Sequence, residues 1–294
     1  MTASLPTGLL LAARPKTLTA AVVPVVVGTA LAAALGHPAI WWRAGCALLG
    51  AAAIQIGTNL FNDLLDFSRG ADTAHRVGPT RVTQAGILTP AQVRAAAVAS
   101  FAVALGCGIP LVVAAGWPIL TLGLLSLFFG YAYTGGPYPL AYHGLGELFV
   151  LTFFGLGAVG GTYYLHAGAL AWPVALAGVQ VGLLACALLA VNNLRDVDED
   201  ARSGKRTLAA RLGVGFGRSE IAVCAFGPLV VNPLWLGTGD RLAALLPLAA
   251  LPLALAAVRV VWRNPPGPSY NRALARAAGL QLAFGALLAL GLAL

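Results

Sequence analysis

Charged residues are scarce in this sequence, and that scarcity excludes an ordinary water-soluble fold. Only 10% of its 294 residues are charged, whereas 59% are hydrophobic. Soluble domains carry about a quarter charged residues and about half apolar residues. A water-soluble fold of this length could not bury so much apolar surface, so the composition predicts a membrane protein.

Cysteine is rare as well, which argues against a disulfide framework or a cysteine-ligated metal. The cysteines are far apart in sequence and form no CxxC pair. All four lie in apolar stretches, and we interpret them as small buried side chains. They are Cys46, Cys107, Cys186 and Cys224.

Several catalytic motifs are missing too. No Walker loop, nucleophile elbow or HExxH motif occurs, which argues against an ATP-driven pump, a serine hydrolase and a zinc protease. Residues 155–160 do spell a dinucleotide-binding fingerprint, Gly-Leu-Gly-Ala-Val-Gly, but they lie inside a long apolar stretch. We interpret these small residues as a helix-packing surface.

Apolar stretches of about twenty residues, the length that crosses a bilayer, recur along the whole chain. They predict an all-α membrane protein with about nine transmembrane helices in a bundle. No soluble block separates the stretches, so residues 1–294 are predicted to form a single transmembrane domain. The predicted spans are 17–35, 44–61, 91–115, 118–133, 146–166, 172–192, 221–236, 243–261 and 273–294.

The remaining charges gather on one side of this predicted bundle. With the N-terminus in the cytoplasm, four connecting segments are cytoplasmic: 62–90, 134–145, 193–220 and 262–272. Among lysines and arginines, only Arg43 and Arg241 then lie outside, which is the positive-inside bias of multi-pass proteins in a bacterial-type inner membrane. The net charge of +8 therefore reports membrane topology and not nucleic-acid binding.

The acidic residues share that cytoplasmic side, with only Asp240 outside, although the positive-inside rule does not require this. Two clusters begin where an apolar helix ends, about four helices apart. Acids three to four residues apart share a helix face, so each cluster can converge on one point. We predict two Asp-rich cytoplasmic loops that cover a central cavity. The clusters comprise Asn62, Asp63, Asp66, Arg69, Asp72, Arg76 and Arg81, and Asn193, Asp196, Asp198, Asp200, Arg202, Lys205, Arg206 and Arg211.

These clusters suit a diphosphate bound through Mg²⁺. The ion takes oxygen ligands, typically only one or two carboxylates, and completes its shell with phosphate oxygens and water. The interleaved lysines and arginines can neutralise the phosphate oxygens directly. The alternative is a pair of solvated loops whose charges pair with one another and with lipid head groups.

The aromatic, Gly/Pro-rich turn over residues 131–140 lies on the same side. Anchoring of aromatic rings at the membrane interface explains it without any chemistry. The π faces of Tyr133 and Tyr138 could also stabilise a carbocation beside a diphosphate site. Both interpretations fit the position of the turn.

The paired motifs, on about nine helices, resemble the UbiA-type superfamily of intramembrane aromatic prenyltransferases over nearly the whole chain. Further segments are similar to its 1,4-dihydroxy-2-naphthoate polyprenyltransferases: 14–18, 76–83, 133–137, 161–164 and 204–208. The resemblance implies transfer of a polyprenyl group from polyprenyl diphosphate to 1,4-dihydroxy-2-naphthoate, with loss of diphosphate and CO₂. The product would be demethylmenaquinol, and Mg²⁺, as two ions bridging the diphosphate, would be the cofactor.

The resemblance also assigns roles by position. Asn62, Asp66, Asn193, Asp196 and Asp200 match metal-diphosphate positions, and Asp63 either ligates the metal or orients a ligand. Asp72 is the nearest acid to a position where the superfamily often has one and this chain has Gly70, and it would bind metal directly or through water. The expected diphosphate-binding residues are Lys16, Arg69, Arg76, Arg81, Lys205 and Arg206. Tyr163 joins Tyr133 and Tyr138 on the cation or acceptor side, and Asp66, Asp196 and Lys205 are the expected catalytic residues.

Two alternative functions are compatible with parts of this pattern. A related prenyltransferase could act on homogentisate, hydroxybenzoate, haem or a glycerol phosphate, since only acceptor contacts would differ. A secondary transporter would also have many helices and intramembrane acids, but here the acids lie at helix ends and in loops.

Overall fold

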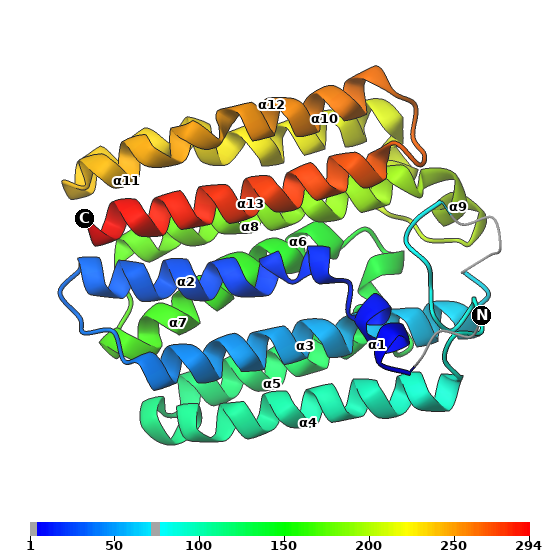
Figure 1. Ribbon diagram of the computed structural model, residues 1–294, viewed down its shortest axis with the longest axis horizontal. Coiled ribbons are helices and arrows are strands. Elements are labelled where there is room, and N and C mark those ends of the chain that lie inside the picture. The colour runs from blue at the N-terminus through cyan, green and yellow to red at the C-terminus, as the bar shows by residue number, and fades with distance from the viewer. Residues whose placement is uncertain (1–4, 72–76) are drawn as a thin grey trace.

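The computed structural model describes residues 5–71 and 77–294, and within these residues the chain forms helices and no strand (Figure 1). The prediction of an all-α fold is confirmed. The long helices lie side by side: α2 (Thr19–Ala34), α3 (Trp41–Ser68), α4 (Pro90–Ala115), α5 (Trp117–Ala132), α8 (Trp172–Arg195), α10 (Leu208–Val231), α12 (Leu251–Arg263) and α13 (Tyr270–Ala293). The shorter elements are α1 (Leu5–Ala13), η1 (Pro15–Thr17), η2 (Leu140–Tyr142), α6 (Gly146–Val150), the π-helical η3 (Leu151–Gly157), α7 (Ala158–Ala167), α9 (Val197–Arg202), η4 (Asn232–Thr238), α11 (Arg241–Leu245) and η5 (Leu246–Ala250).

The helices have the length and composition of membrane spans. In the described part of the chain, seven are long and apolar enough to cross a bilayer, and a bent pair, Leu5–Thr17 with Thr19–Ala34, can add an eighth. Helix α5 is apolar but has only 16 residues, short of the roughly twenty that a perpendicular span needs. An integral multi-pass membrane protein is therefore confirmed, with seven or eight spans by this criterion where the sequence predicts nine.

The bend before α2 has a local cause. Arg14 adopts a left-handed conformation with φ 52°, which is uncommon for a residue other than glycine. It precedes Pro15, and proline disfavours the right-handed helical conformation in the residue before it. The chain turns by 53° between the helix pair as a result. This turn brings Arg14 and Thr17 to the edge of the central cavity.

Two predicted loops are shorter than expected, which corrects the sequence analysis. Helix α3 continues to Ser68, so the segment predicted as a loop from residue 62 is helical at its start. Helix α10 begins at Leu208 and not near residue 221, with a kink at Gly213, where the backbone is not helical (φ 86°, ψ 173°). Hydropathy marks where a helix leaves the apolar layer, whereas backbone hydrogen bonds can carry the helix further through polar residues.

Small residues allow close packing between η3 and α8. A Cβ atom on Gly155 would lie 2.4 Å from the carbonyl oxygen of Gly178 and 2.7 Å from the Cα of Gly182. Backbones this close leave no room for a side chain. The glycine-rich segment 155–160 is therefore a helix contact, as the sequence predicted.

The ends of the helices place both Asp-rich motifs at one end of the bundle. Helix α3 ends there, as does α8, which leads into α9 at the right of Figure 1. The C-terminus lies at the opposite end. Motifs about 130 residues apart in sequence are thus neighbours in space.

Candidate active site

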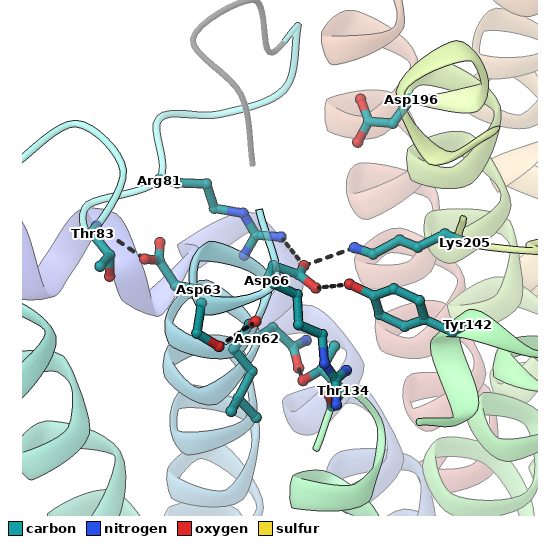
Figure 2. A network of polar contacts seen from close by, with 12 residues as sticks. Asn62, Asp63, Asp66, Arg81, Thr83, Thr134, Tyr142, Asp196 and Lys205 are labelled. Atoms are coloured by element: carbon teal, nitrogen blue, oxygen red, sulfur yellow. Dashed lines mark hydrogen bonds and ion pairs between the residues drawn. The ribbon is translucent and has the colours of Figure 1, made fainter. Parts of the chain in front are cut away.

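Asp66 is the centre of a buried polar network near the C-terminal end of α3 (Figure 2). Its Oδ2 atom pairs with Lys205 Nζ at 2.8 Å and with Arg81 Nη2 at 3.1 Å. Its Oδ1 atom accepts a hydrogen bond from the Tyr142 hydroxyl at 3.0 Å. Asp66 is only 1% exposed, and a carboxylate so buried needs such partners. Three distant segments of the chain therefore meet on one side chain.

Asn62 and Asp63 lie one turn earlier on α3, in different surroundings. Asn62 Oδ1 accepts a hydrogen bond from the Thr134 hydroxyl at 2.6 Å, and Asn62 lines the same cavity as Asp66. Asp63 instead accepts the backbone N–H groups of Val82 and Thr83, each at 3.0 Å. Asp63 thus holds the segment that carries Arg81 against α3.

The second motif spans the end of α8 and the start of α9. Asn193 Nδ2 donates a hydrogen bond to Glu147 Oε1 at 2.8 Å. Asp196 caps the C-terminus of α8 and receives two hydrogen bonds from Arg195, at 2.7 and 2.8 Å. Asp200, in α9, is buried. Figure 2 shows Asp196 on the far side of the Asp66 network from Asp63.

One cavity joins the two motifs and extends between the helices. Its polar end includes Asn62, Asp66, Arg81, Asn193, Asp196, Asp200 and Lys205. Its inner wall includes Ile54, Phe129, Phe149, Phe153, Phe154 and Leu188. Three of these phenylalanine rings pack together with centroids 4.7 to 6.0 Å apart. The cavity suits a molecule with a polyanionic head and an apolar or aromatic body.

The polar end suits Mg²⁺ by its donor chemistry. Carboxylate and amide oxygens are the ligand type that this ion prefers. Among the residues that the structure describes, no three His, Cys, Asp or Glu side chains are grouped closely enough to hold a metal ion alone. Mg²⁺ typically takes one or two carboxylates and completes its shell with phosphate oxygens and water.

Two tyrosines at the polar end remain protonated. Burial raises the pKa of Tyr142 above its ordinary value, and the negative charge of Asp66 raises it further. Burial also raises the pKa of Tyr133, with a smaller contribution from Glu147. Both phenols are therefore hydrogen-bond donors across the physiological pH range.

Comparison with known proteins decides the family. The profile of the UbiA prenyltransferase family matches residues 21–291. The chain belongs to the UbiA prenyltransferase family. A 1,4-dihydroxy-2-naphthoate octaprenyltransferase of Mycobacterium leprae is 38% identical over 285 residues, 95% of this chain and 93% of that protein. One of Escherichia coli is 37% identical, over 85% of this chain and 83% of that protein.

Solved structures of UbiA homologues share the fold. One from Aeropyrum pernix K1 aligns with a TM-score of 0.70 at 16% identity, covering 94% of this chain and 96% of the other. One from Archaeoglobus fulgidus, bound to GPP and Mg²⁺, aligns with a TM-score of 0.68 at 14% identity, covering 97% and 99%. At these identities the likeness concerns the fold alone.

In this UbiA-family chain, several predicted site residues lie away from the cavity. Lys16 is exposed on η1, and Tyr138 is 58% exposed and stacks on His143. Tyr163 packs in the hydrophobic core of the bundle, in edge contact with His37. Among the predicted tyrosines, only Tyr133 lines the cavity.

Of the other basic residues predicted to bind diphosphate, some line the cavity and some do not. Arg81 and Lys205 line the cavity, whereas Arg69 and Arg206 line a second, separate pocket. Arg69 donates hydrogen bonds to the carbonyl oxygens of Thr134 and Gly136. Asp72 and Arg76 lie outside the described residues.

Sequence reasoning missed several cavity residues. Gln55 and Asn59 line the cavity on the α3 face that also carries Asn62 and Asp66. Their spacing of 55, 59, 62 and 66 is a polar stripe on an otherwise apolar helix, and that signal could have identified them. Tyr142 lines the second pocket and reaches Asp66 from there. It lies beyond the aromatic turn and carries no motif, so this contact could not be read from the sequence.

Proposed function

We propose that this chain transfers a polyprenyl group from a polyprenyl diphosphate to 1,4-dihydroxy-2-naphthoate and forms demethylmenaquinol, a step of menaquinone or phylloquinone biosynthesis. The observation that carries the proposal is the cavity shared by the two motifs, with Asp66 and Lys205 at its polar end and phenylalanine rings beyond them. The names of the Mycobacterium leprae and Escherichia coli relatives support this acceptor.

The reaction balances without removal of a ring proton. The allylic C–O bond of the donor breaks, and its electron pair leaves with diphosphate. The naphthoate carbon that bears the carboxylate forms a bond to the prenyl C1 atom. The carboxylate then leaves as CO₂ and returns its electron pair to the ring. The protein therefore has to bind, orient and shield the reactants.

The polar end is built to receive the diphosphate. Asn62, Asp66, Asn193, Asp196 and Asp200 would hold Mg²⁺, as two ions, with Asp63 orienting the site. When bound, Mg²⁺ neutralises diphosphate oxygens and favours departure of the leaving group. Lys205 and Arg81 both pair with one Asp66 oxygen, and they would neutralise the phosphate charge that develops as the C–O bond breaks.

The inner wall of the cavity would surround the allylic group of the donor. The rings of Phe129, Phe149, Phe153 and Tyr133 line the cavity beside the polar end. Aromatic faces attract cationic character, so they stabilise the allylic group as the C–O bond breaks. The apolar walls also exclude water, which would otherwise hydrolyse the donor.

Membrane topology belongs to the same proposal. The chain acts as one domain over residues 1–294 and crosses an inner membrane nine times. This count adds to the seven long helices the bent pair, Leu5–Thr17 with Thr19–Ala34, as one span and α5 as another. The polar end of the cavity faces the cytoplasm, where most of the lysines and arginines lie.

The test is an acceptor competition. Purified full chain in detergent is given a polyprenyl diphosphate, Mg²⁺ and an equimolar mixture of 1,4-dihydroxy-2-naphthoate, homogentisate and 4-hydroxybenzoate. Mass spectrometry should find the decarboxylated prenyl-naphthoquinol as the main product. Preferential prenylation of another phenol would overturn the acceptor, and no prenylation by folded protein would overturn the activity.

A further inference from the structure

Gln55 is a buried cavity residue that the reaction described above leaves without a role. It lies in α3, is 8% exposed and lines the same cavity as Asp66. Its Oε1 atom is buried and accepts no hydrogen bond within the described part of the chain. An unsatisfied buried carbonyl oxygen is costly and rare, so one beside a cavity indicates a bound donor.

The orientation of the Gln55 amide is fixed by Thr17. The Thr17 hydroxyl donates its proton to the carbonyl oxygen of Arg14 at 2.9 Å. It accepts hydrogen bonds from Gln55 Nε2 at 3.3 Å and from Asn59 Nδ2 at 3.1 Å. A hydroxyl has one proton and two lone pairs, so Thr17 has no capacity left. With the Thr17 proton on the Arg14 carbonyl, rotating the Gln55 amide would set two oxygens against each other, so this hydrogen-bond arrangement leaves Oε1 free.

The free oxygen requires a ligand that donates a hydrogen bond. The prenyl diphosphate offers none, because its oxygens are ionised and its tail is hydrocarbon. A dihydroxylated aromatic ring offers two phenolic O–H groups. Gln55 is also placed correctly for such a ring, since it precedes Asn62 by seven positions on α3, about 10 Å along the helix. It therefore lies deeper along α3 than Asn62 and Asp66, on the part of the cavity wall that the diphosphate at the polar end leaves open to the acceptor.

We infer that Gln55 Oε1 accepts a hydrogen bond from a phenolic hydroxyl of the aromatic acceptor and is a specificity residue for hydroxylated rings. The inference rests on the proposed function, since it concerns the acceptor of that reaction. It predicts that a substitution of Gln55 changes the KM for the acceptor and not the KM for the donor.

The test combines a variant with altered acceptors. Gln55→Met keeps the length of the side chain and removes the carbonyl oxygen. Its kinetics are compared with wild type for 1,4-dihydroxy-2-naphthoate and for the two mono-methyl ethers of that acceptor, in which one hydroxyl can no longer donate. Ser126→Ala is the matched control, because Ser126 also lines the cavity but donates to Leu122 of its own helix. Unfolding temperatures report the folding of each variant.

The expected result for Gln55→Met is a KM for the dihydroxy acceptor raised about tenfold, the usual contribution of one hydrogen bond, with the donor KM within about twofold of wild type. One ether should be a poor acceptor for wild type, and Gln55→Met should lose most of that discrimination. Gln55→Asn, which keeps the amide but shortens it, should show a smaller loss. Equal effects on donor and acceptor, or unchanged discrimination between acceptor and ethers, would overturn the inference. If wild type itself does not prenylate the dihydroxynaphthoate, the proposed function fails and the inference fails with it.

Discussion

At the scale of single residues, Lys205 and Arg81 both form an ion pair with the same carboxylate oxygen of Asp66, Oδ2. Asp66→Asn should lower kcat at least about a hundredfold, because it removes a metal-ligand charge at the site where the leaving group departs. It should also lower the unfolding temperature, since the buried Arg81 and the partly buried Lys205 each lose an ion pair with this carboxylate. Steady-state turnover and a thermal unfolding curve measure the two effects.

Asp196→Asn should affect turnover more than stability. Asp196 pairs with the adjacent Arg195, whose side chain is buried and also donates a hydrogen bond to Asn271 Oδ1 at 3.0 Å. We expect a loss of turnover comparable to that of Asp66→Asn, with a smaller drop in unfolding temperature, because Arg195 keeps its hydrogen bond to Asn271. A rate near wild type in either variant would contradict a metal site shared by the two motifs.

Lys205 is predicted to act on the donor. Lys205→Ala should raise the KM for polyprenyl diphosphate about tenfold or more and leave the KM for the acceptor within about twofold, because a charge-assisted hydrogen bond to phosphate is lost. Arg206→Ala is the matched control, since the exposed Arg206 lines the separate pocket. An effect of Lys205→Ala confined to the acceptor would show that the diphosphate lies elsewhere.

The residues at helix ends could be read from the sequence, whereas those brought in by tertiary packing could not. Asn62, Asp66 and Asp196 can be recognised as polar residues that follow apolar runs, and in the structure all three line one cavity. Tyr163 was expected beside the site from a resemblance in one short segment, but helix packing places it in the core. The direction of a side chain on a buried helix depends on its neighbours, which a single sequence does not report.

At the scale of helices, the contact between η3 and α8 sets the inner wall of the cavity. Gly155→Ala should lower the free energy of unfolding by about 1–3 kcal/mol or more, because the added Cβ would meet the Gly178 carbonyl at 2.4 Å and the helices must separate. Activity should fall with it, since Phe153 and Phe154 on η3 line the cavity. Denaturant unfolding in mixed micelles and an activity assay measure both.

Gly160→Ala is the control on the same span. A Cβ at Gly160 would meet its nearest neighbour at 3.6 Å, an ordinary contact. This variant should retain wild-type stability and activity. Equal loss in both variants would mean that the general loss of glycine flexibility, and not the close approach of η3 to α8, decides the outcome.

The helical elements themselves were largely predictable, because apolar runs of membrane length have few other stable structures in lipid. Their ends were not. Helix α3 runs on to Ser68 and α10 starts at Leu208, through polar residues that hydropathy assigns to loops. The π-helical turn over Leu151–Gly157 also has no signature in the periodicity of the sequence.

At the scale of the whole molecule, the distribution of lysine and arginine predicts which end of the bundle faces the cytoplasm. In spheroplasts, Pro38→Cys should react with a membrane-impermeant maleimide, whereas Pro265→Cys should react only after permeabilisation. Both positions are exposed. Pro38 lies in the segment between α2 and α3 and Pro265 in the segment between α12 and α13, and these two segments are at opposite ends of the bundle (Figure 1). The background is a variant with the native cysteines replaced by alanine. The reverse labelling pattern would place the polar end of the cavity outside the cell.

The most direct test of the whole account is a coupled measurement of CO₂ release and prenyl transfer. Wild-type protein is given 1,4-dihydroxy-2-naphthoate labelled in its carboxyl group together with polyprenyl diphosphate, with Mg²⁺ and then with excess EDTA. The account predicts one labelled CO₂ for each prenyl-naphthoquinol formed, with both abolished by EDTA and restored by added Mg²⁺. Prenyl transfer that continues in EDTA, or product that retains the labelled carboxylate, would contradict it.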